Sequence, residues 1–247
     1  MTLPILGLLL RVDWATVPAA ITSADAVDAL LLSLRTGAAA TIICVIVGVP
    51  LALVIARSRP RVAGLLRAVT TLPLVLPPMV GGIALLYLLG RNGVVGQYLD
   101  VAWGVRIPFT TAAVVIAQSF VALPFLVIAV EGALRSTGTR FESVAATLGA
   151  SRWTVFRRIT LPLVWPGLVA GTVLCFARAL GEFGATALFA GNAAGATRTM
   201  PLAIYTAFNG AGVSQDSAIA LSLLLVAVAI VILLVLRIPR VQRAEPK

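Results

Sequence analysis

The chain contains five long stretches that carry no charged residue, and these stretches constrain its fold more strongly than any other feature of the sequence. A helix needs about 20 predominantly apolar residues to cross the roughly 30 Å hydrocarbon core of a bilayer. Each stretch is close to this length or exceeds it, so we predict five full transmembrane helices in an all-α integral membrane protein. The stretches are Thr36–Ala56, Ala68–Gly90, Ile107–Val130, Ile159–Ala177 and Ser217–Leu236.

The composition excludes the soluble and disordered classes of protein. Apolar residues make up 60% of the 247 residues and charged residues only 11%, whereas soluble domains contain about 45–50% and about 25% respectively. Disordered chains are poorer still in apolar residues. The sequence has no histidine, and Cys44 and Cys175 lie in apolar stretches. We therefore expect two reduced thiols buried in the membrane and no metal site.

The N-terminal stretch Met1–Leu10 is apolar but too short to span a bilayer, and Pro4 lies within it. No positive residue precedes it, so we do not expect a signal peptide. Two alternatives remain, an interfacial helix or a shortened first transmembrane helix. Polar residues Asp13–Asp28 then separate it from the first full span.

Lysine and arginine are concentrated in one set of connections between the predicted spans. That set carries 13 of the 19 basic residues, whereas the opposite set carries 4. Because cytoplasmic connections are enriched in Lys and Arg, we predict that the first set and the C-terminus are cytoplasmic. The net charge of +10 then reflects membrane orientation rather than a nucleic-acid partner. The cytoplasmic set comprises Arg57–Arg67, Arg135–Arg158 and Arg237–Lys247, and the opposite set comprises Arg11, Arg91, Arg106 and Arg198.

Proline and glycine interrupt the predicted spans, most densely in Thr71–Gly82, which contains Pro77 and Pro78. Membrane helices tolerate such residues where neighbouring helices or a water-filled cavity satisfy the freed backbone groups. The cluster predicts a break in the second span. The break either allows close packing of neighbouring helices or belongs to a helix that lines a transport path.

One connection on the predicted cytoplasmic side, residues 135–162, has helical character of its own. We predict a helix over Phe141–Leu148 that Gly149 ends, and a second helix with Ser151 as its N-cap. Pro162 would begin the following span. Two short helices with an apolar face and a basic face suit either a groove on a cytoplasmic partner or the surface of an anionic membrane.

Four residues of this loop have the spacing of a known motif. Gly149 is followed ten residues later by Ile159, and then by Leu161 and Pro162. The loop thereby resembles the coupling motif of binding-protein-dependent ABC importer permeases, which contacts an ATPase subunit. The family places an acid six residues before the glycine, where this chain has Ser143, and the resemblance implies that neighbouring Glu142 takes that role. The residues marked for coupling are Glu142, Ala145, Gly149, Ala150, Arg152, Phe156, Ile159, Leu161 and Pro162.

This resemblance implies a type I ABC importer permease fold for a single transmembrane domain over residues 1–247. The coupling loop would lie between the fourth and fifth spans of the family. Family members have six spans, so a truncated first helix over about Met1–Val12 would complete the five predicted here. Such a permease works in the cell membrane, in contact with lipid, as a homodimer with two ATPase subunits and an external oxyanion-binding protein.

The chain itself is expected neither to hydrolyse ATP nor to bind a cofactor. Its sequence has no G-x-x-x-x-G-K-[ST] phosphate loop, so the partner ATPase would use ATP and Mg²⁺. An integral-membrane enzyme is the remote alternative, and it would need paired carboxylates, histidine or a nucleophile near the membrane surface. A passive channel is not favoured, because a channel that works without ATP does not need a loop that contacts an ATPase.

A second resemblance concerns the substrate. Within Phe176–Tyr205 the run ARALGEFGAT is followed by GN, TRT and PLAIY, and it resembles molybdate permeases of the molybdate/sulfate branch. The run LPLVLPP over Leu72–Pro78 is similar to the same branch. The alternatives are a sulfate/thiosulfate permease and a tungstate permease, because tungstate has nearly the size and charge of molybdate.

Arg178 and Glu182 directly follow the uncharged stretch Ile159–Ala177, and the apolar character resumes after Glu182 as far as Ala190. Their spacing of four predicts that they share one helix face and can form an ion pair. An arginine within a span is costly unless it faces a partner or an aqueous cavity. The pair is therefore either structural, or Arg178 faces a translocation path and eases the passage of a dianion. We name Arg178, Glu182, Pro77 and Pro78 as candidates for this path, and Arg35 as an interfacial anchor.

Overall fold

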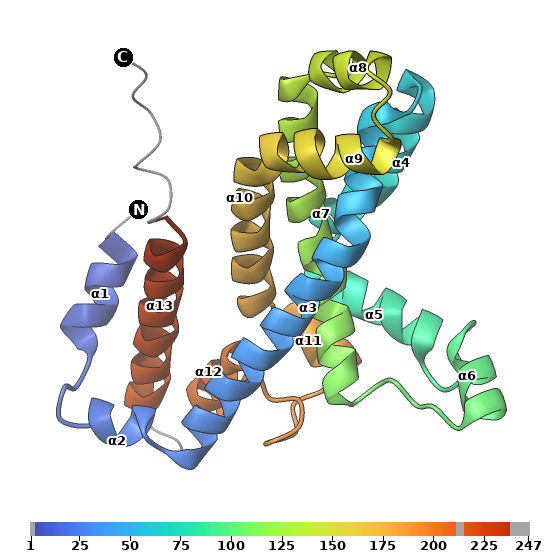
Figure 1. Ribbon diagram of the computed structural model, residues 1–247. Helices are drawn as coiled ribbons and strands as arrows, with labels where there is room; N and C mark the ends of the chain where they lie inside the picture. Colours follow the sequence, from blue (N-terminus) through green and yellow to red (C-terminus); the bar gives the residue numbers. More distant parts are fainter. Residues whose placement is uncertain (1–2, 211–214, 238–247) are drawn as a thin grey trace, which may run out of the picture. The chain divides into compact units, whose positions relative to one another are not determined.

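The computed structural model describes residues 3–210 and 215–237, and every regular element in these ranges is a helix. Figure 1 shows the helices in chain order. They are α1 (Leu3–Arg11), α2 (Val17–Ile21), α3 (Ala24–Arg57), α4 (Pro60–Val75), α5 (Pro78–Leu89), α6 (Gly96–Trp103), α7 (Thr111–Thr137), α8 (Arg140–Thr147), α9 (Arg152–Val155), the π-helical turn η1 (Phe156–Thr160), α10 (Leu161–Leu180), α11 (Gly184–Phe189), α12 (Met200–Asn209) and α13 (Gln215–Arg237).

The chain divides into two compact units, each built from separate segments. Unit 1 consists of Met1–Gly37, Pro78–Gln118 and Leu180–Lys247, and unit 2 consists of Ala38–Pro77 and Ser119–Ala179. Helices α3, α7 and α10 each contribute residues to both. Our prediction of one transmembrane domain over the whole chain stays a prediction.

Within the described residues, three helical segments are long and apolar enough to cross a membrane. They are α3, α7 and the continuous run Arg152–Leu180, and α4 with α5, bent by 113° at their junction, counts as a fourth if the pair is one broken span. Four of the five predicted spans thus fall in such segments. The fifth corresponds to α13, whose apolar part, Asp216–Ile232, is shorter. Five full spans, a truncated first helix and a cytoplasmic C-terminus stay predictions, and Arg240, Arg243 and Lys247 lie outside the described residues.

The polar stretch Asp13–Asp28, which separates α1 from the first full span, is partly helical. Helix α3 already begins at Ala24 and places Asp25 in its first turn. An aspartate in that position interacts favourably with the positive end of the helix dipole. The short α1 that precedes it ends at Arg11.

The predicted break in the second span is confirmed. Helix α4 ends at Val75, and Leu76 is extended at φ −70° and ψ 134°. Helix α5 begins at Pro78. A proline disfavours the helical conformation for the residue before it and has no N–H to donate, so Pro77 and Pro78 end α4 and set the start of α5. The isolated prolines lie inside helices that continue through them, namely Pro50, Pro73, Pro124 and Pro166.

Small residues allow the helices of unit 2 to pack closely. A Cβ added at Gly167 would lie 2.4 Å from the Ala133 Cβ, and one at Gly171 would lie 2.9 Å from the Ala129 Cβ. These contacts bring α10 against α7 in the manner typical of membrane helices. Cys44 and Cys175 are buried and form no disulfide, as predicted.

Unit 1 has its core where α12 and α13 pack together, and α2 also packs against α13 (Figure 1). The Ser33 hydroxyl of α3 accepts a hydrogen bond of 2.7 Å from the Met200 N–H at the start of α12. A second contact joins α5 to α11, where Gly82 lies against the backbone of Ala185. The apolar core contains Ala26, Ala29, Met200, Ala203, Ala207, Ala218 and Leu221.

Helix α6 follows α5 and is held by a carboxylate between two arginines. Asp100 accepts hydrogen bonds from Arg106 Nε at 3.0 Å and from Arg91 Nε at 3.2 Å. The hydrogen bond from Arg106, aided by the charges of both arginines, holds the pKa of Asp100 below its usual value in spite of partial desolvation. Gly104 ends the helix in the left-handed conformation at φ +65°.

Candidate functional site

In the loop 135–162 the short helix α8 and a second helix that starts at Arg152 meet at a glycine, as predicted, but the second helix continues to Leu180 and is not short. Helix α8 ends near Leu148, and Gly149 follows at φ +81°. In this turn the Gly149 N–H donates to the Ala146 carbonyl at 3.1 Å and the Ala150 N–H donates to the Ala145 carbonyl at 3.0 Å. Glycine adopts this left-handed conformation without steric cost, so Gly149 suits the end of the helix.

Ser151 starts the second helix in the predicted way. Its backbone is extended, and its Oγ accepts a hydrogen bond of 3.3 Å from the Thr154 N–H. This bond satisfies one of the free N–H groups of the first helical turn.

The helix shows no break at Pro162, because it runs without interruption from Arg152 to Leu180. Its part α10 begins at Leu161, one residue before Pro162, and the start of the span at Pro162 stays a prediction. The turn η1 has π-helical hydrogen bonds, and the Leu161 N–H donates to the carbonyl of Phe156, five residues back. The register of the backbone bonds therefore changes directly before Pro162. This change lets the helix continue through a residue that has no N–H.

Glu142 is the centre of a polar cluster within unit 2. Its Oε1 accepts a hydrogen bond of 2.7 Å from Arg57 Nη2 at the end of α3 and one of 2.6 Å from Thr160 Oγ1 in η1. The side chain of Glu142 is 19% exposed, and Thr160 is buried. One carboxylate thus joins three elements, α3, α8 and η1.

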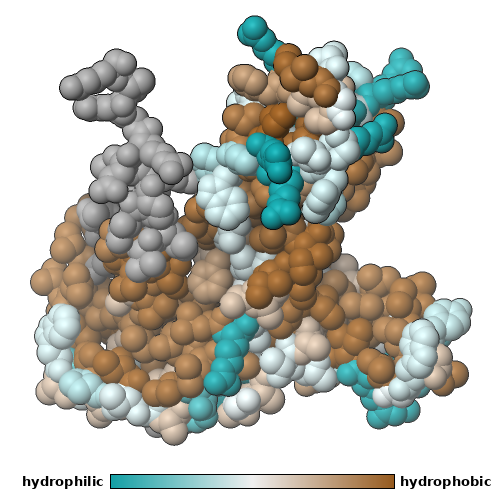
Figure 2. All heavy atoms as spheres, viewed as in Figure 1, coloured by the Kyte–Doolittle hydropathy of each residue, from teal (hydrophilic) through white to brown (hydrophobic). Residues whose placement is uncertain are grey.

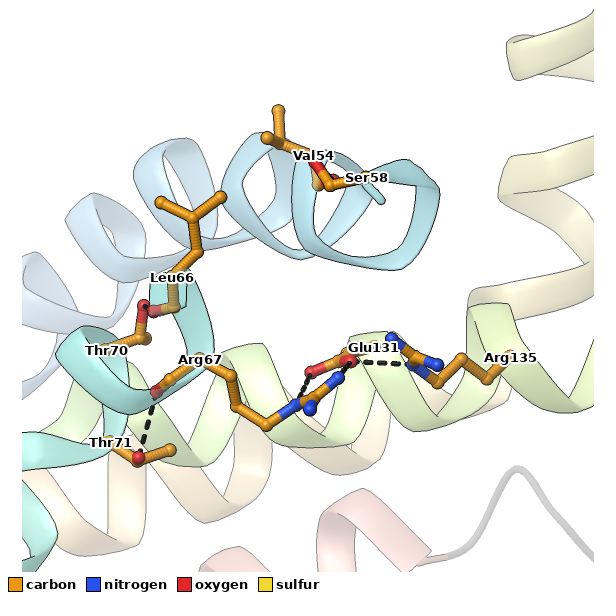
Figure 3. Close-up of polar contacts among 8 residues, drawn as sticks. All are labelled: Val54, Ser58, Leu66, Arg67, Thr70, Thr71, Glu131 and Arg135. Carbon is orange, nitrogen blue, oxygen red and sulfur yellow. Dashed lines mark hydrogen bonds and ion pairs between the residues drawn. The ribbon is translucent and has the colours of Figure 1, made fainter. Parts of the chain in front are cut away.

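Glu131 is the centre of a second cluster that the sequence analysis did not identify (Figure 3). Arg67 of α4 donates through Nε and Nη2 to the two carboxylate oxygens, and Arg135 donates through Nε to Oε1 at 2.7 Å. The Glu131 side chain is only 6% exposed. The four-residue spacing of Glu131 and Arg135 was a signal for their ion pair, whereas nothing in the local sequence indicated Arg67.

A groove of about 730 Å³ lies between α8 and the beginning of the following long helix. Its lining is apolar apart from two arginines, and it consists of Arg140, Phe141, Val144, Ala145, Leu148, Arg158, Ile159, Pro162 and Leu163. Phe141, Val144 and Leu148 are largely exposed. The rings of Trp153 and Phe156 contact each other beside it, with centroids 5.8 Å apart. Figure 2 shows hydrophilic residues, in teal, gathered at this α8–α9 end.

Six of the nine predicted coupling residues fall into three groups. Gly149 and Ala150 form the turn, Ala145, Ile159 and Pro162 line the groove, and Glu142 forms the internal cluster. Arg152 is exposed at the start of α9, whereas Phe156 and Leu161 are half-buried. Their roles in coupling stay predictions.

The prediction that Arg178 and Glu182 share a helix face is wrong. Helix α10 ends at Leu180, with the half-buried Arg178 in its last turn, and Glu182 lies beyond this end. Glu182 is buried, and its Oε1 accepts a hydrogen bond of 2.8 Å from the Ala185 N–H. It thus satisfies a free N–H at the start of α11, which begins at Gly184. Pro77 and Pro78 are exposed at the break between α4 and α5.

Replacing Glu131 by glutamine should lower the stability of the solubilised protein. The change removes the charge that offsets two guanidinium groups, and we expect a loss of about 1–3 kcal/mol because both arginines can partly return to water. Thermal unfolding measured by size-exclusion chromatography after heating checks this. Asp100→Asn is the control, since its arginines are more exposed and exposed pairs contribute little. An equal loss of thermal stability in both variants would show that the burial of Glu131 does not increase the contribution of its ion pairs to stability.

The described residues contain no group of three or more His, Cys, Asp or Glu side chains that could hold a metal ion. The groove and the two polar clusters all belong to unit 2. The clusters join α8 to the end of α3 and to η1 through Glu142, and α7 to α4 through Glu131.

Comparisons with known proteins agree with this geometry. Residues 48–243 match the family described as "Binding-protein-dependent transport system inner membrane component". The chain is 56% identical over 225 residues to the "Molybdenum transport system permease protein ModB" of Mycobacterium tuberculosis, which covers 91% of this chain and 84% of that protein. The protein of the same description from Escherichia coli K12 is 42% identical over 191 residues, covering 77% and 83%.

A solved structure shows the fold. It is the crystal structure of a bacterial ABC transporter that imports the acidic polysaccharide alginate, and it matches with a TM-score of 0.76 at 19% identity over 99% of this chain and 91% of that chain. The predicted all-helical importer-permease fold is thereby confirmed, while the number of spans stays a prediction.

Proposed function

Because this chain belongs to the family of binding-protein-dependent transport system inner membrane components, we propose that it is the permease subunit of an ATP-driven molybdate importer. The observation that carries the proposal is the high identity to molybdenum transport permeases over nearly the whole chain. It agrees with the resemblance found in Phe176–Tyr205. The sulfate/thiosulfate alternative is less favoured for the same reason.

In this proposal two copies of the chain form the translocation path in the cell membrane. Two separate ATPase subunits use ATP and Mg²⁺, and an external oxyanion-binding protein delivers the anion. The C-terminus and the loop 135–162 lie on the cytoplasmic side. Closure of the ATPase pair displaces the loop, and the helices change between inward-open and outward-open arrangements. The chain contributes no ATP hydrolysis of its own.

The two polar clusters explain how movement of the loop reaches the helices of unit 2. Glu142 joins α8 to the end of α3 through Arg57 and to η1 through Thr160. Glu131 joins α7 to α4 through Arg67. Charge-assisted hydrogen bonds of this kind are stronger and more directional than neutral ones. In this proposal a force on the loop is passed through Glu142 to α3 and η1, while Glu131 keeps α4 attached to α7.

Arg178 is our candidate for contact with the travelling anion. Its guanidinium carries several hydrogen-bond donors whose geometry suits an oxyanion. It lies half-buried in the last turn of α10. Transport also requires release, so we propose a transient contact rather than a tight site. Glu182, Pro77 and Pro78 stay candidates for the same path.

The experiment that tests the proposed function is uptake of labelled molybdate into vesicles that contain the permease, its ATPase and its binding protein. We expect ATP-dependent uptake that excess tungstate inhibits and excess sulfate leaves nearly unchanged. Inhibition by sulfate as strong as that by tungstate would favour the sulfate/thiosulfate alternative. Uptake without ATP would instead indicate a passive channel.

Replacing Arg178 by alanine should lower molybdate uptake about tenfold, equivalent to about 1.4 kcal/mol, without reducing the amount of assembled complex. The expected cause is loss of a positive charge that the dianion meets on its path. Uptake per assembled complex is the measurement, and Arg35→Ala is the matched control because Arg35 is an exposed residue of α3. Parallel loss of uptake and assembly would assign Arg178 a structural role.

A further inference from the structure

Helix α6 is joined to the end of α5 by a tight turn within unit 1 (Figure 1). The Val94 N–H in this turn donates to the Tyr87 carbonyl of α5 at 3.1 Å. Gly96 begins α6 at a position where an added Cβ would overlap the Gly90 carbonyl oxygen, so a residue with a side chain does not fit there. The two helices thus form a hairpin over residues 78–103, which we call the α5–α6 hairpin.

The charged residue of α6 faces inward, and the outward face of this helix has no charge. The Asp100 side chain is only 17% exposed and lies between Arg91 and Arg106. The outward face carries Val101, which is 89% exposed, and the exposed Tyr98. A helix that faces water has the reverse distribution, because its apolar face is buried and its charged face is outside. The outward face of α6 is therefore suited to an apolar environment.

A mainly apolar pocket of about 250 Å³ lies between α5 and α6. Its apolar lining includes Leu86 and Leu89 of α5 and Phe109, which follows α6. Arg91 and Arg106 line the same pocket. Phe109 has φ +61°, which is rare for a bulky residue, and such strained positions are concentrated where proteins hold ligands. The pocket thus combines hydrocarbon walls with two guanidinium groups.

The two arginines of this pocket have donors and charge to spare for an anion. Arg91 and Arg106 both donate to Asp100 through Nε, and their terminal Nη groups form no hydrogen bond with another of the described residues. Their side chains are mostly exposed. Two arginines and one aspartate leave one net positive charge, which matches the single negative charge of a phosphodiester. The paired N–H groups of a guanidinium suit phosphate oxygens.

We propose that the α5–α6 hairpin binds a phospholipid with one negative charge, with the phosphate at Arg91 and Arg106 and part of an acyl chain in the apolar pocket. Helix α6 then lies in the membrane interface, in the leaflet opposite the basic loops, with Val101 toward the hydrocarbon. Tyr98 and Trp103 lie at the level of the headgroups, where these residue types are enriched, and long arginine side chains reach the headgroups from such a position. The inference depends on the membrane location of the chain and not on the anion that it transports.

Retention of lipid by the purified full-length permease tests the site. We expect phosphatidylglycerol to remain bound during detergent exchange, as measured by native mass spectrometry, and we expect the double variant Arg91→Gln, Arg106→Gln to retain about tenfold less. The control Arg59→Gln, Arg61→Gln removes two exposed arginines on the predicted cytoplasmic side and should retain the wild-type amount. Equal retention by the two double variants would overturn the proposal. Displacement of the lipid by excess inorganic phosphate would also overturn it, because the site would then be one for free anions.

Asp100→Asn gives a second readout that does not depend on removing the arginines. The substitution removes the carboxylate that competes with phosphate for Arg91 and Arg106. We therefore expect the variant to retain more phosphatidylglycerol than the wild type. A purely structural role of these three residues predicts the opposite, because the loss of Asp100 would loosen the hairpin, and lower retention would contradict the lipid site.

A nitroxide label at Val101→Cys tests the position of α6 in a phosphatidylglycerol nanodisc. Cys44 and Cys175 are buried, so the label should react with the new cysteine alone. We expect the label to collide more often with O₂, which concentrates in hydrocarbon, than with a water-soluble nickel chelate. A label at Ala194→Cys, an exposed residue between α11 and α12, should show the reverse preference. A Val101 label that prefers the nickel chelate would place α6 in water, and one shielded from both reagents would indicate a protein partner, so either result would overturn the proposal.

Discussion

Replacing Gly149 by proline should abolish ATP-driven uptake while leaving the permease inserted in the membrane. Proline requires φ near −65°, and Gly149 has φ +81°. The substitution also removes the N–H that donates to the Ala146 carbonyl. Helix α8 would then end in a different direction, and both the groove and the Glu142 cluster would be lost. The spans lie outside this turn, so we expect insertion to be normal.

The matched control is Gly149→Asn, because asparagine tolerates the left-handed conformation better than other residues with a side chain. No atom lies within 4 Å of the position that a Cβ would occupy at Gly149, so the added side chain meets no steric obstacle. The complex with the asparagine variant should keep most of the ATP-driven uptake. In the complex with the proline variant the separate ATPase subunit should still hydrolyse ATP, but this hydrolysis should no longer drive uptake. Uptake that survives the proline substitution would show that the shape of this turn is unimportant.

Replacing Gly82 by valine should disrupt unit 1 and strongly lower the yield of folded protein. A Cβ at Gly82 would lie 2.8 Å from the carbonyl oxygen and 2.9 Å from the Cα of Ala185. These are backbone atoms, so no side-chain rotation relieves the clash, and α5 must move away from α11. Overpacking usually costs about 1–3 kcal/mol, and we expect the upper part of this range or more because the obstacle is backbone.

The same substitution at Gly64 provides the control. Gly64 lies in helix α4, and no atom lies within 4 Å of the position of its added Cβ. Both substitutions replace glycine by valine within a helix and so change the helix propensity in the same way, and only Gly82→Val introduces the clash. The melting temperature of each solubilised variant is the measurement. Equal melting temperatures would contradict the close contact between α5 and α11.

Features that depend on local backbone chemistry could be predicted from the sequence. Gly149 ends α8 and Ser151 caps α9, because glycine and serine act on backbone groups within a few residues. Pro77 and Pro78 break the second span for an equally local reason. The family, too, was identified from residues whose spacing is visible in the sequence, and the match over residues 48–243 confirms it.

Features that depend on distant partners could not be predicted. Glu142 meets Arg57 from a position 85 residues away in the chain, and Glu131 meets Arg67 from 64 residues away. The four-residue spacing of Arg178 and Glu182 was misleading, because the helix ends between them and Glu182 bonds to the start of α11. Similarly, the π-helical turn before Pro162 changes the backbone register in a way that no single residue type indicates.

The sequence by itself indicated that this chain spans a membrane and which loop resembles a coupling motif, and it predicts the side on which the basic loops lie. Each of these properties follows from local composition or from fixed spacing along one segment. Only the tertiary structure decided that the acid of that loop is bound internally and that its outer face is apolar and basic. The reason is physical: a carboxylate binds whichever donor the fold brings to it, and the donor here comes from the far end of another helix.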